Sequence, residues 1–350
     1  MSCMDTKIIK IQDPEKEQAA LAEAGAIVRS GGLVVFPTET VYGLGANGLA
    51  ADAISAIYRA KGRPSDNPVI LHVADKNGVK DIVKEVNSTA EKLMDTFWPG
   101  PLTIIFPRSA LVPDRATGGL DTVAVRCPSD PIAHAFLKAA GVPVAAPSAN
   151  ISGRPSPTTA EDAAHDMMGK VDLILDGGNS AIGLESTVVE AADGKITILR
   201  PGGITKEMLE AVAKEVSYDA HLITGEGVPK APGMKYRHYA PAAPMTVVVG
   251  QEQAVRRELQ RLYDAYKKEG LSVGFLVSEE LKAGLPEGPV YIWGSRSEQK
   301  DLAEHLYKGL LYFDTAGVDR ILAEGTEEHG LGAAIMNRMG KASGHHILYV

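Results

Sequence analysis

The sequence is poor in aromatic residues and has no excess of positive charge. Aromatic residues make up 5% of the chain, and 36 Lys and Arg face 44 Asp and Glu, for a formal net charge of −8. Proteins that hold nucleic acid along a broad surface combine basic stripes with aromatic side chains on which bases stack. The composition therefore disfavours such a surface, although it leaves room for a local basic pocket.

Cysteines and long apolar runs are also scarce. The two cysteines, Cys3 and Cys127, cannot form a disulfide framework, which favours a reducing compartment. No C-x-x-C or H-E-x-x-H spacing offers a zinc site. The first residues lack the pattern of a signal peptide, and no apolar run reaches the roughly 18–20 residues that span a bilayer. We expect a cytoplasmic protein that does not use a membrane.

The length of 350 residues and the order of apolar segments predict two α/β domains. Over residues 1–216, short apolar strands alternate with helices and some strands follow one another directly, which is typical of a twisted mixed sheet. Lys7–Ile11 is the first expected strand, and Asp13-Pro14 should begin a helix that ends at Arg29. Residues 245–350 alternate regularly and predict a smaller, Rossmann-like parallel α/β domain.

Residues 217–244 separate the two domains and are rich in proline. Four prolines between positions 229 and 244 exclude a long helix or a central strand there, so we interpret the segment as an extended linker. It nevertheless carries the run Lys235-Tyr236-Arg237-His238-Tyr239, which has more charged and aromatic side chains than a spacer needs.

Five loops of the first domain combine glycine, proline or hydroxyl residues with charge. Catalytic and binding groups concentrate on loops held by a rigid α/β scaffold, so we interpret these loops as one site. Their basic side chains, with Arg126 at the end of an apolar strand, predict a concave pocket for phosphate or carboxylate oxygens. The loops are Pro37–Gly45, Lys61–Pro68, Pro147–Ser156, Glu185–Thr187 and Arg200–Gly203.

The sequence has no P-loop and no G-x-S-x-G nucleophile elbow. Gly43, Gly45 and Gly48 do match G-x-G-x-x-G, which makes a dinucleotide-binding enzyme an alternative. Six residues separate the preceding strand from the first glycine, where the tight turn should follow almost at once. The acidic residue Asp75 also comes later than the motif requires.

Several motifs follow one another in order along the first domain. They are Pro37-Thr38-Glu39-Thr40-x-Tyr42-Gly43-Leu44, Lys61-x-Arg63, Pro99-Gly100-Pro101-Leu102-Thr103, Ser148-x-Asn150, Ser186-Thr187 and Arg200-Pro201-Gly202. Over about residues 8–207 this set resembles the YrdC-like family of L-threonylcarbamoyl-AMP synthases. The segments Pro232–Pro241 and Gly330–Arg338 resemble its two-domain subfamily.

The resemblance implies a nucleotidyltransferase that converts L-threonine, bicarbonate and ATP into L-threonylcarbamoyl-AMP and pyrophosphate. Other tRNA-modification proteins would then pass the threonylcarbamoyl group to the adenosine beside the anticodon, so contact with tRNA would be indirect. Catalysis by positioning and charge stabilisation needs no enzyme nucleophile. Because the relatives act in tRNA modification, an RNA-binding module without catalysis is a further alternative.

The resemblance also implies residue roles. Catalysis would depend on Lys61, Arg63, Ser148 and Asn150. L-threonine would be held by Thr40, His72, Arg126, Ala146 and Ser186, with Arg126 on its carboxylate. ATP would be held by Arg63, Asn67, Thr122, Ser148, Ser156, Arg200 and Tyr236. Mg²⁺ would arrive with ATP, near Asn150, and the linker with Tyr236 would act as a lid anchored by the second domain.

Overall fold

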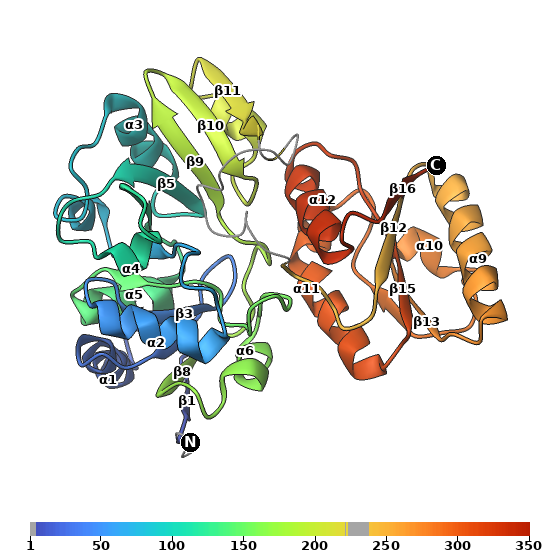
Figure 1. Ribbon diagram of the computed structural model, residues 1–350, viewed down its shortest axis with the longest axis horizontal. Helices are drawn as coiled ribbons and strands as arrows, with labels where there is room; N and C mark the ends of the chain where they lie inside the picture. Colours follow the sequence, from blue (N-terminus) through green and yellow to red (C-terminus); the bar gives the residue numbers. More distant parts are fainter. Residues whose placement is uncertain (1–4, 221, 223–237) are drawn as a thin grey trace. The chain divides into compact units, whose positions relative to one another are not determined.

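The computed structural model describes residues 5–220, 222 and 238–350 (Figure 1). The chain forms two compact units. Unit 1 contains the described residues up to Ser152, then Pro157–Ala181 and the described residues from Glu185 to 222. Unit 2 contains the described residues from His238 to Val350, together with the short segments Gly153–Ser156 and Ile182–Leu184. Within the described ranges, every helix is too short or too polar to cross a membrane.

Unit 1 is built on one large mixed sheet. Its strands, in the order in which they pair, are β1 (Lys7–Lys10), β8 (Leu173–Asp176), β2 (Val34–Phe36), β3 (Gly43–Asn47), β7 (Val144–Ala145), β4 (Ile70–His72), β6 (Thr122–Arg126), β5 (Leu102–Pro107), β9 (Thr187–Ala192), β10 (Lys195–Arg200) and β11 (Glu215–Tyr218). Its helices are α1 (Gln18–Arg29), α2 (Ala51–Lys61), η1 (Lys76–Val79), α3 (Ser88–Phe97), α4 (Asp114–Thr117), α5 (Pro131–Ala140), α6 (Ala160–Met167) and α7 (Lys206–Glu210).

Alternation along the central strands separates the core from the polar groups. Val123 and Val125 of β6 are buried in the main hydrophobic core, whereas Arg126 belongs to the opposite face. Arg126 pairs with His72 of β4 on one side and with Thr103 of β5 on the other. Register therefore places a cation, an imidazole and a hydroxyl in one row across three strands.

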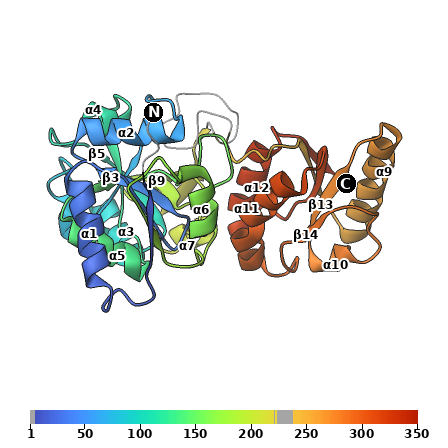
Figure 2. The same cartoon turned by 90° about the horizontal axis from the view of Figure 1, so that it is seen from below.

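Helices α1 and α5 lie side by side over one part of the sheet (Figures 1 and 2). Their apolar faces form a second core cluster that includes Val28 of α1 and Phe136 of α5. Gly25 permits this close approach, because a Cβ atom there would lie 2.4 Å from the carbonyl oxygen of Ala139. The pair fixes the segment that precedes α5, which leads directly from Arg126.

Helix α1 begins later than the sequence indicates. The prediction of a helix start at Asp13-Pro14 is wrong, since α1 starts at Gln18. Asp13 instead forms a turn in which the N–H of Lys16 donates to its carbonyl oxygen. The carboxylate of Glu17 accepts the N–H groups of Gln12 and Asp13, which fixes this turn outside the helix.

The glycine motif at positions 43–48 lies in a strand. Gly43–Asn47 forms β3, which pairs antiparallel with β2, so Gly43 and Gly45 lie within a strand and not in a tight turn between a strand and a phosphate-binding helix. Gly45 has a packing role, because a Cβ atom there would lie 2.9 Å from Cγ1 of Val144 and 3.0 Å from the Phe36 ring. The alternative of a dinucleotide-binding enzyme using Gly43, Gly45 and Gly48 is wrong.

Unit 2 contains a fully parallel sheet. Its strands pair in the order β14 (Val290–Ile292), β13 (Val273–Val277), β15 (Arg320–Glu324), β12 (Met245–Val249) and β16 (Ile347–Tyr349). Figure 1 shows α9 (Glu252–Lys268) and α10 (Glu279–Lys282) on one face, and α11 (Gln299–Ala316) and α12 (Leu331–Ala342) on the other. The predicted fold class, a mixed-sheet α/β domain followed by a smaller parallel α/β domain, is confirmed.

Candidate active site

Arg126, at the end of β6, is the centre of a buried polar cluster in unit 1. Its Nη1 donates to Oγ1 of Thr40 at 2.8 Å, and its Nε donates to the carbonyl oxygen of Gly100 at 3.4 Å. Its Nη2 lies 2.8 Å from Oε1 of Glu39. Nε and Nη1 each use one N–H in a hydrogen bond, which leaves Nη1 a second N–H, whereas the buried Nη2 has no hydrogen-bond partner among the described residues.

The Glu39 side chain gives this cluster a matched negative charge. Burial by itself would raise the pKa of the Glu39 carboxyl, but the attraction of Arg126 outweighs it and the pKa lies below its ordinary value. Both side chains are about nine-tenths buried or more. The guanidinium of Arg126 is therefore held in place by an ion pair with Glu39, which belongs to the Pro37–Gly45 loop.

His72 lies beside Arg126 in the sheet register and is fully buried. Burial, together with the nearby charge of Arg126, lowers the pKa of His72 to about 3. The imidazole is neutral at physiological pH as a result. Ala146, which follows β7, donates its backbone N–H to the carbonyl oxygen of Ile70 and so lies next to the same strand.

Hydroxyl groups extend the cluster from Arg126 to Arg200. Thr103 pairs with Arg126 across β5 and β6, and its hydroxyl shares a hydrogen bond of 2.8 Å with the hydroxyl of Ser186. Arg200 donates through Nη2 to the Ser186 hydroxyl at 3.1 Å and to the Ser186 carbonyl oxygen at 2.9 Å. Two arginines thus approach one small polar region from different strands.

Lys61 forms a second buried cluster with Ser148 and Asn150. Its Nζ donates to the carbonyl oxygens of Ser148, at 2.5 Å, and Asn150. The Ser148 hydroxyl donates to Oδ1 of Asn150 at 2.5 Å. Burial, with a smaller contribution from Arg63, lowers the pKa of Lys61 well below its ordinary value.

Local structure fixes the position of this second cluster. Lys61 ends α2 because Gly62 adopts the left-handed conformation, with φ of 61°. The loop after β7 is held by hydrogen bonds from Leu44 N to the Pro147 carbonyl and from Ala149 N to the Tyr42 carbonyl. The predicted catalytic residues Lys61, Ser148 and Asn150 are therefore brought together.

Arg63, Asn67 and Thr122 lie on another side of the first domain's loops. Arg63 donates to the carbonyl oxygens of Asn67 and Pro68, and the buried side-chain amide nitrogen of Asn67 has no hydrogen-bond partner among the described residues. Thr122 begins β6 and Arg126 ends it, which separates their Cα atoms by roughly 13 Å at about 3.3 Å per residue. Thr122, predicted for ATP, and Arg126, predicted for threonine, thus stand at opposite ends of one strand.

Some residues from the sequence analysis are not brought to these clusters. Arg154, from the Pro147–Ser156 loop, forms an ion pair of 3.2 Å with Asp314 within unit 2. Ser156 is buried and belongs to the Gly153–Ser156 segment of unit 2. Tyr236 and Arg237, and with them the predicted lid, lie outside the described residues.

Comparison with known proteins identifies the family. The family described as "Telomere recombination", which groups Sua5, YciO and YrdC, matches residues 26–202, and "Threonylcarbamoyl-AMP synthase, C-terminal domain" matches residues 204–344. A threonylcarbamoyl-AMP synthase of Pyrococcus abyssi is 47% identical over 99% of this chain and 100% of its own length. The chain belongs to the threonylcarbamoyl-AMP synthase family.

Two further comparisons, one with a sequence and one with a solved structure, also extend along nearly the whole chain. The threonylcarbamoyl-AMP synthase of Bacillus subtilis is 46% identical over 98% of this chain and 97% of its own length. The crystal structure of P. abyssi Sua5 complexed with L-threonine superposes with a TM-score of 0.92 at 45% identity, covering 99% of each chain. The predicted family membership is confirmed.

Sequence reasoning missed several charged and polar members of the site. Glu39 and Thr103 contact predicted residues directly, and Glu185 and Asp166 act electrostatically on Lys61. Glu39 and Thr103 lie inside motifs that are typical of the family. No sequence pattern could have paired them with Arg126 and Ser186, because that pairing depends on strand order in the sheet.

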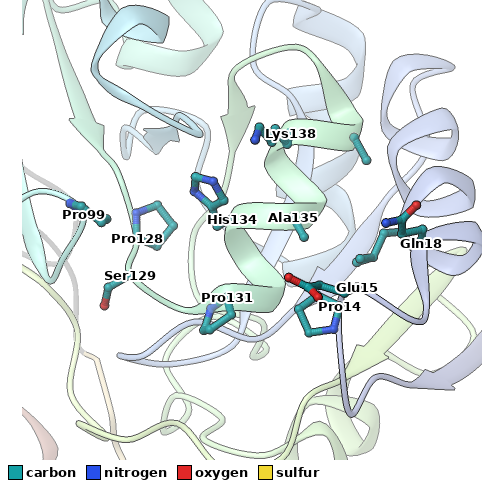
Figure 3. A pocket seen from close by; sticks show the side chains of 12 residues that line it. Pro14, Glu15, Gln18, Pro99, Pro128, Ser129, Pro131, His134, Ala135 and Lys138 are labelled. Atoms are coloured by element: carbon teal, nitrogen blue, oxygen red, sulfur yellow. The ribbon is translucent and has the colours of Figure 1, made fainter.

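A hollow of about 700 Å³ lies elsewhere in unit 1, beside α5 (Figure 3). Figure 3 shows its lining side chains on α5, on the segment before α5 and near the start of α1. Four prolines contribute to the wall, and none of the predicted site residues is part of the lining. Pro99 of the hollow belongs to a family motif, but the residues proposed for threonine and ATP lie outside its lining.

Proposed function

We propose that this chain is an L-threonylcarbamoyl-AMP synthase, which makes L-threonylcarbamoyl-AMP and pyrophosphate from L-threonine, bicarbonate and ATP. One observation carries the proposal in particular. The buried guanidinium of Arg126 retains a donor on each terminal nitrogen, in a chain that is similar along its whole length to a Sua5 protein complexed with L-threonine. A planar guanidinium with two such donors is suited to a carboxylate.

The threonine site is proposed to form around Arg126. The carboxylate of L-threonine would accept hydrogen bonds from the guanidinium, whose orientation is fixed by Glu39 and Thr40. Ser186 supplies a hydroxyl, and Ala146 supplies a small apolar side chain. Neutral His72 adds no second positive charge, so its ring is available for hydrogen bonding or packing without repelling the substrate amine.

The chemistry proceeds without an enzyme nucleophile. The threonine amine forms a bond to the carbon of bicarbonate, water is lost, and an N-carboxylate results. An oxygen of this carboxylate attacks the α-phosphorus of ATP as the bond to the bridging oxygen of pyrophosphate breaks. The protein's part is to align the N-carboxylate with the α-phosphate and to balance the charge of the departing pyrophosphate.

The residues of the second cluster are proposed to act on ATP. In the unliganded chain, Lys61 donates to the Ser148 and Asn150 carbonyl groups. A phosphate oxygen would provide Lys61 with a charged acceptor and favour its protonated form. Arg200, at the far end of the hydroxyl network, would contact the same nucleotide, as would the remaining predicted residues Arg63, Asn67, Thr122, Ser156 and Tyr236.

Mg²⁺ is proposed to bind together with ATP. Within the described ranges, no group of three or more His, Cys, Asp and Glu side chains could hold a metal ion. The oxygen ligands that Mg²⁺ prefers fit the phosphates themselves and the hydroxyl and amide oxygens of Ser148 and Asn150. When bound, the ion would neutralise phosphate charge.

The product and setting follow from the same proposal. We propose that tRNA-modification proteins accept L-threonylcarbamoyl-AMP, that tRNA contact is indirect, and that the protein acts in the cytoplasm. The excess of 44 acidic over 36 basic residues supports indirect contact with tRNA. The presence of only two cysteines supports the cytoplasm.

Pyrophosphate release tests the activity. Purified full-length protein is given ATP, L-threonine and bicarbonate, and each is omitted in turn. We expect release only in the complete mixture, with a product of the mass of L-threonylcarbamoyl-AMP. Intact ATP in the complete mixture, or release that does not require threonine, would contradict the proposal.

A further inference from the structure

The sheet of unit 2 has a point at which its connections reverse direction. Strands β12 and β15 are neighbours, yet the chain leaves β12 toward β13 and leaves β15 toward β16, on opposite sides. The helices that follow these two strands accordingly cover opposite faces, as Figure 1 shows for α9 and α12. In open α/β sheets, ligands bind in the crevice beyond the carboxyl ends of the strands at such a reversal.

A cavity of about 650 Å³ occurs at this place. Residues that end or directly follow four parallel strands line it, namely Gly250 after β12, Ser278 after β13, Trp293 after β14 and Glu324 at the end of β15. All of the lining belongs to unit 2. The volume lies in the range of small-molecule sites.

Arg296 and Glu324 place a fixed charge pair in this cavity. Nε of Arg296 lies 2.8 Å from Oε1 of the buried Glu324, and Nη2 donates to the carbonyl oxygen of Gly250 at 2.6 Å. Glu324 also accepts the backbone N–H of Ser278 at 2.7 Å. Arg296 therefore spans the ends of β12 and β15, and the rest of its five-donor fork is available to a ligand.

Three long helices begin at the cavity, two of them without side-chain caps. Gln251 before α9, Gln299 at the start of α11 and His329 before α12 belong to the lining. No side chain caps α9 or α11, whereas the side-chain oxygen of Gln299 accepts the N–H of Gly332 in the first turn of α12. In unit 1, by contrast, Asp130 caps α5 and Thr159 caps α6. Uncapped N–H groups and helix dipoles favour an anion.

Trp293 provides an independent indication that a ligand belongs here. Its side chain is 1% exposed and belongs to the cavity lining. Its indole N–H has no hydrogen-bond acceptor among the described residues. A buried indole normally finds an acceptor, and leaving one unpaired costs free energy. A ligand oxygen would remove that cost.

We propose that this cavity binds a small phosphate-bearing ligand of the nucleoside monophosphate class. The phosphate binds to Arg296 and the helix N-termini, and the carboxylate of Glu324 accepts hydrogen bonds from hydroxyl groups of the ligand. The site is separate from the proposed threonine and ATP clusters, and it gives unit 2 a ligand of its own.

The two tryptophans of the chain allow a residue-specific test. Trp293 lines the cavity, whereas the indole of Trp98 in unit 1 donates to the Leu102 carbonyl oxygen at 2.7 Å. Full-length protein labelled with ¹⁵N at the tryptophan indoles is titrated with AMP, pyrophosphate and inorganic phosphate at constant ionic strength. Trp293→Phe assigns the two signals. We expect a saturable shift of the Trp293 signal, largest with AMP.

Matched variants test which residues hold the ligand. Arg296→Ala, and independently Thr326→Asp in the cavity lining, should weaken the response of Trp293 at least tenfold. Arg261→Ala removes an exposed arginine of α9 that pairs with Glu258, and should leave the response intact. No Trp293 shift with any of the three probes, a shift of Trp98 alone, or an undiminished shift in both cavity variants would overturn the proposal.

Discussion

Glu39 and Arg126 form a buried ion pair of 2.8 Å in the first unit, between a loop and the end of β6. The pair keeps the guanidinium from turning toward the core and leaves two of its donors for a substrate. A substrate carboxylate would thus meet an arginine that is already oriented, which reduces the entropy that binding must offset.

Arg126→Ala should raise the KM for threonine by about 10- to 100-fold, because charge-assisted hydrogen bonds of about 1.5–3 kcal/mol are lost. The KM for ATP should change much less. Steady-state kinetics with each substrate varied in turn makes this comparison. Arg108→Ala, which removes an arginine paired with the exposed Asp114, serves as the control. An unchanged threonine KM in Arg126→Ala would remove Arg126 from the carboxylate role.

Glu39→Gln should leave the Arg126 charge buried without its partner. Breaking a buried pair in this way costs about 3–5 kcal/mol of folding free energy, which denaturant unfolding measures. The threonine KM should rise together with this loss, while the ATP KM stays near its original value. Glu23→Gln, which breaks an exposed pair with Lys7, should do neither. Wild-type threonine KM in a folded Glu39→Gln variant would show that the pair does not orient Arg126 for binding.

Lys61→Ala should lower kcat by about 10²–10³-fold, the range found when one preorganised donor to a developing charge is removed. Pyrophosphate release under saturating substrates measures it. Lys92→Ala is a matched control, since Lys92 also donates to a backbone carbonyl but is far more exposed. Turnover close to that of the wild type would mean that Lys61 only supports the Ser148–Asn150 loop.

Acid should destabilise the chain through His72. Its pKa is about 3 in the folded chain, against 6.5 for the ordinary side chain. Between these values the unfolded chain binds more protons, so stability falls by about 1.4 kcal/mol for each pH unit of decrease. Denaturant unfolding of wild type and His72→Gln from pH 7 to pH 4 should give a shallower slope for the variant. Equal slopes in the wild type and in His72→Gln would contradict the prediction.

Local signals in the sequence identified much of the fold. The apolar run at Thr122–Arg126 forms β6, which ends at Arg126 as predicted, and Gly62 ends α2 directly after Lys61. Both depend on side-chain pattern and on glycine conformation, which neighbouring residues specify. Asp13-Pro14 misled because the chain forms only an isolated turn there, held by the Glu17 carboxylate on the Asp13 N–H, and the helix starts afresh at Gln18.

The arrangement of the site was less accessible to sequence reasoning. Thr40 and Arg126 are in contact although 86 residues separate them along the chain. Strand order decides that contact, and nothing in either segment specifies it. Family motifs identified the residues, whereas the contact of Glu39 with Arg126 depends on the path of a loop and that of Thr103 depends on the register of the sheet.

That register also has a consequence for insertions. His72, Arg126 and Thr103 occupy one row across β4, β6 and β5. Side chains alternate between the two faces along each strand, so the position of each residue in its strand decides the face on which its side chain lies. One residue added within β6 would turn Arg126 into the apolar layer and bring a valine to the polar face. Length changes in these three strands are therefore more damaging than most substitutions, whereas the exposed loops at the far ends of the strands can lengthen without disturbing the row.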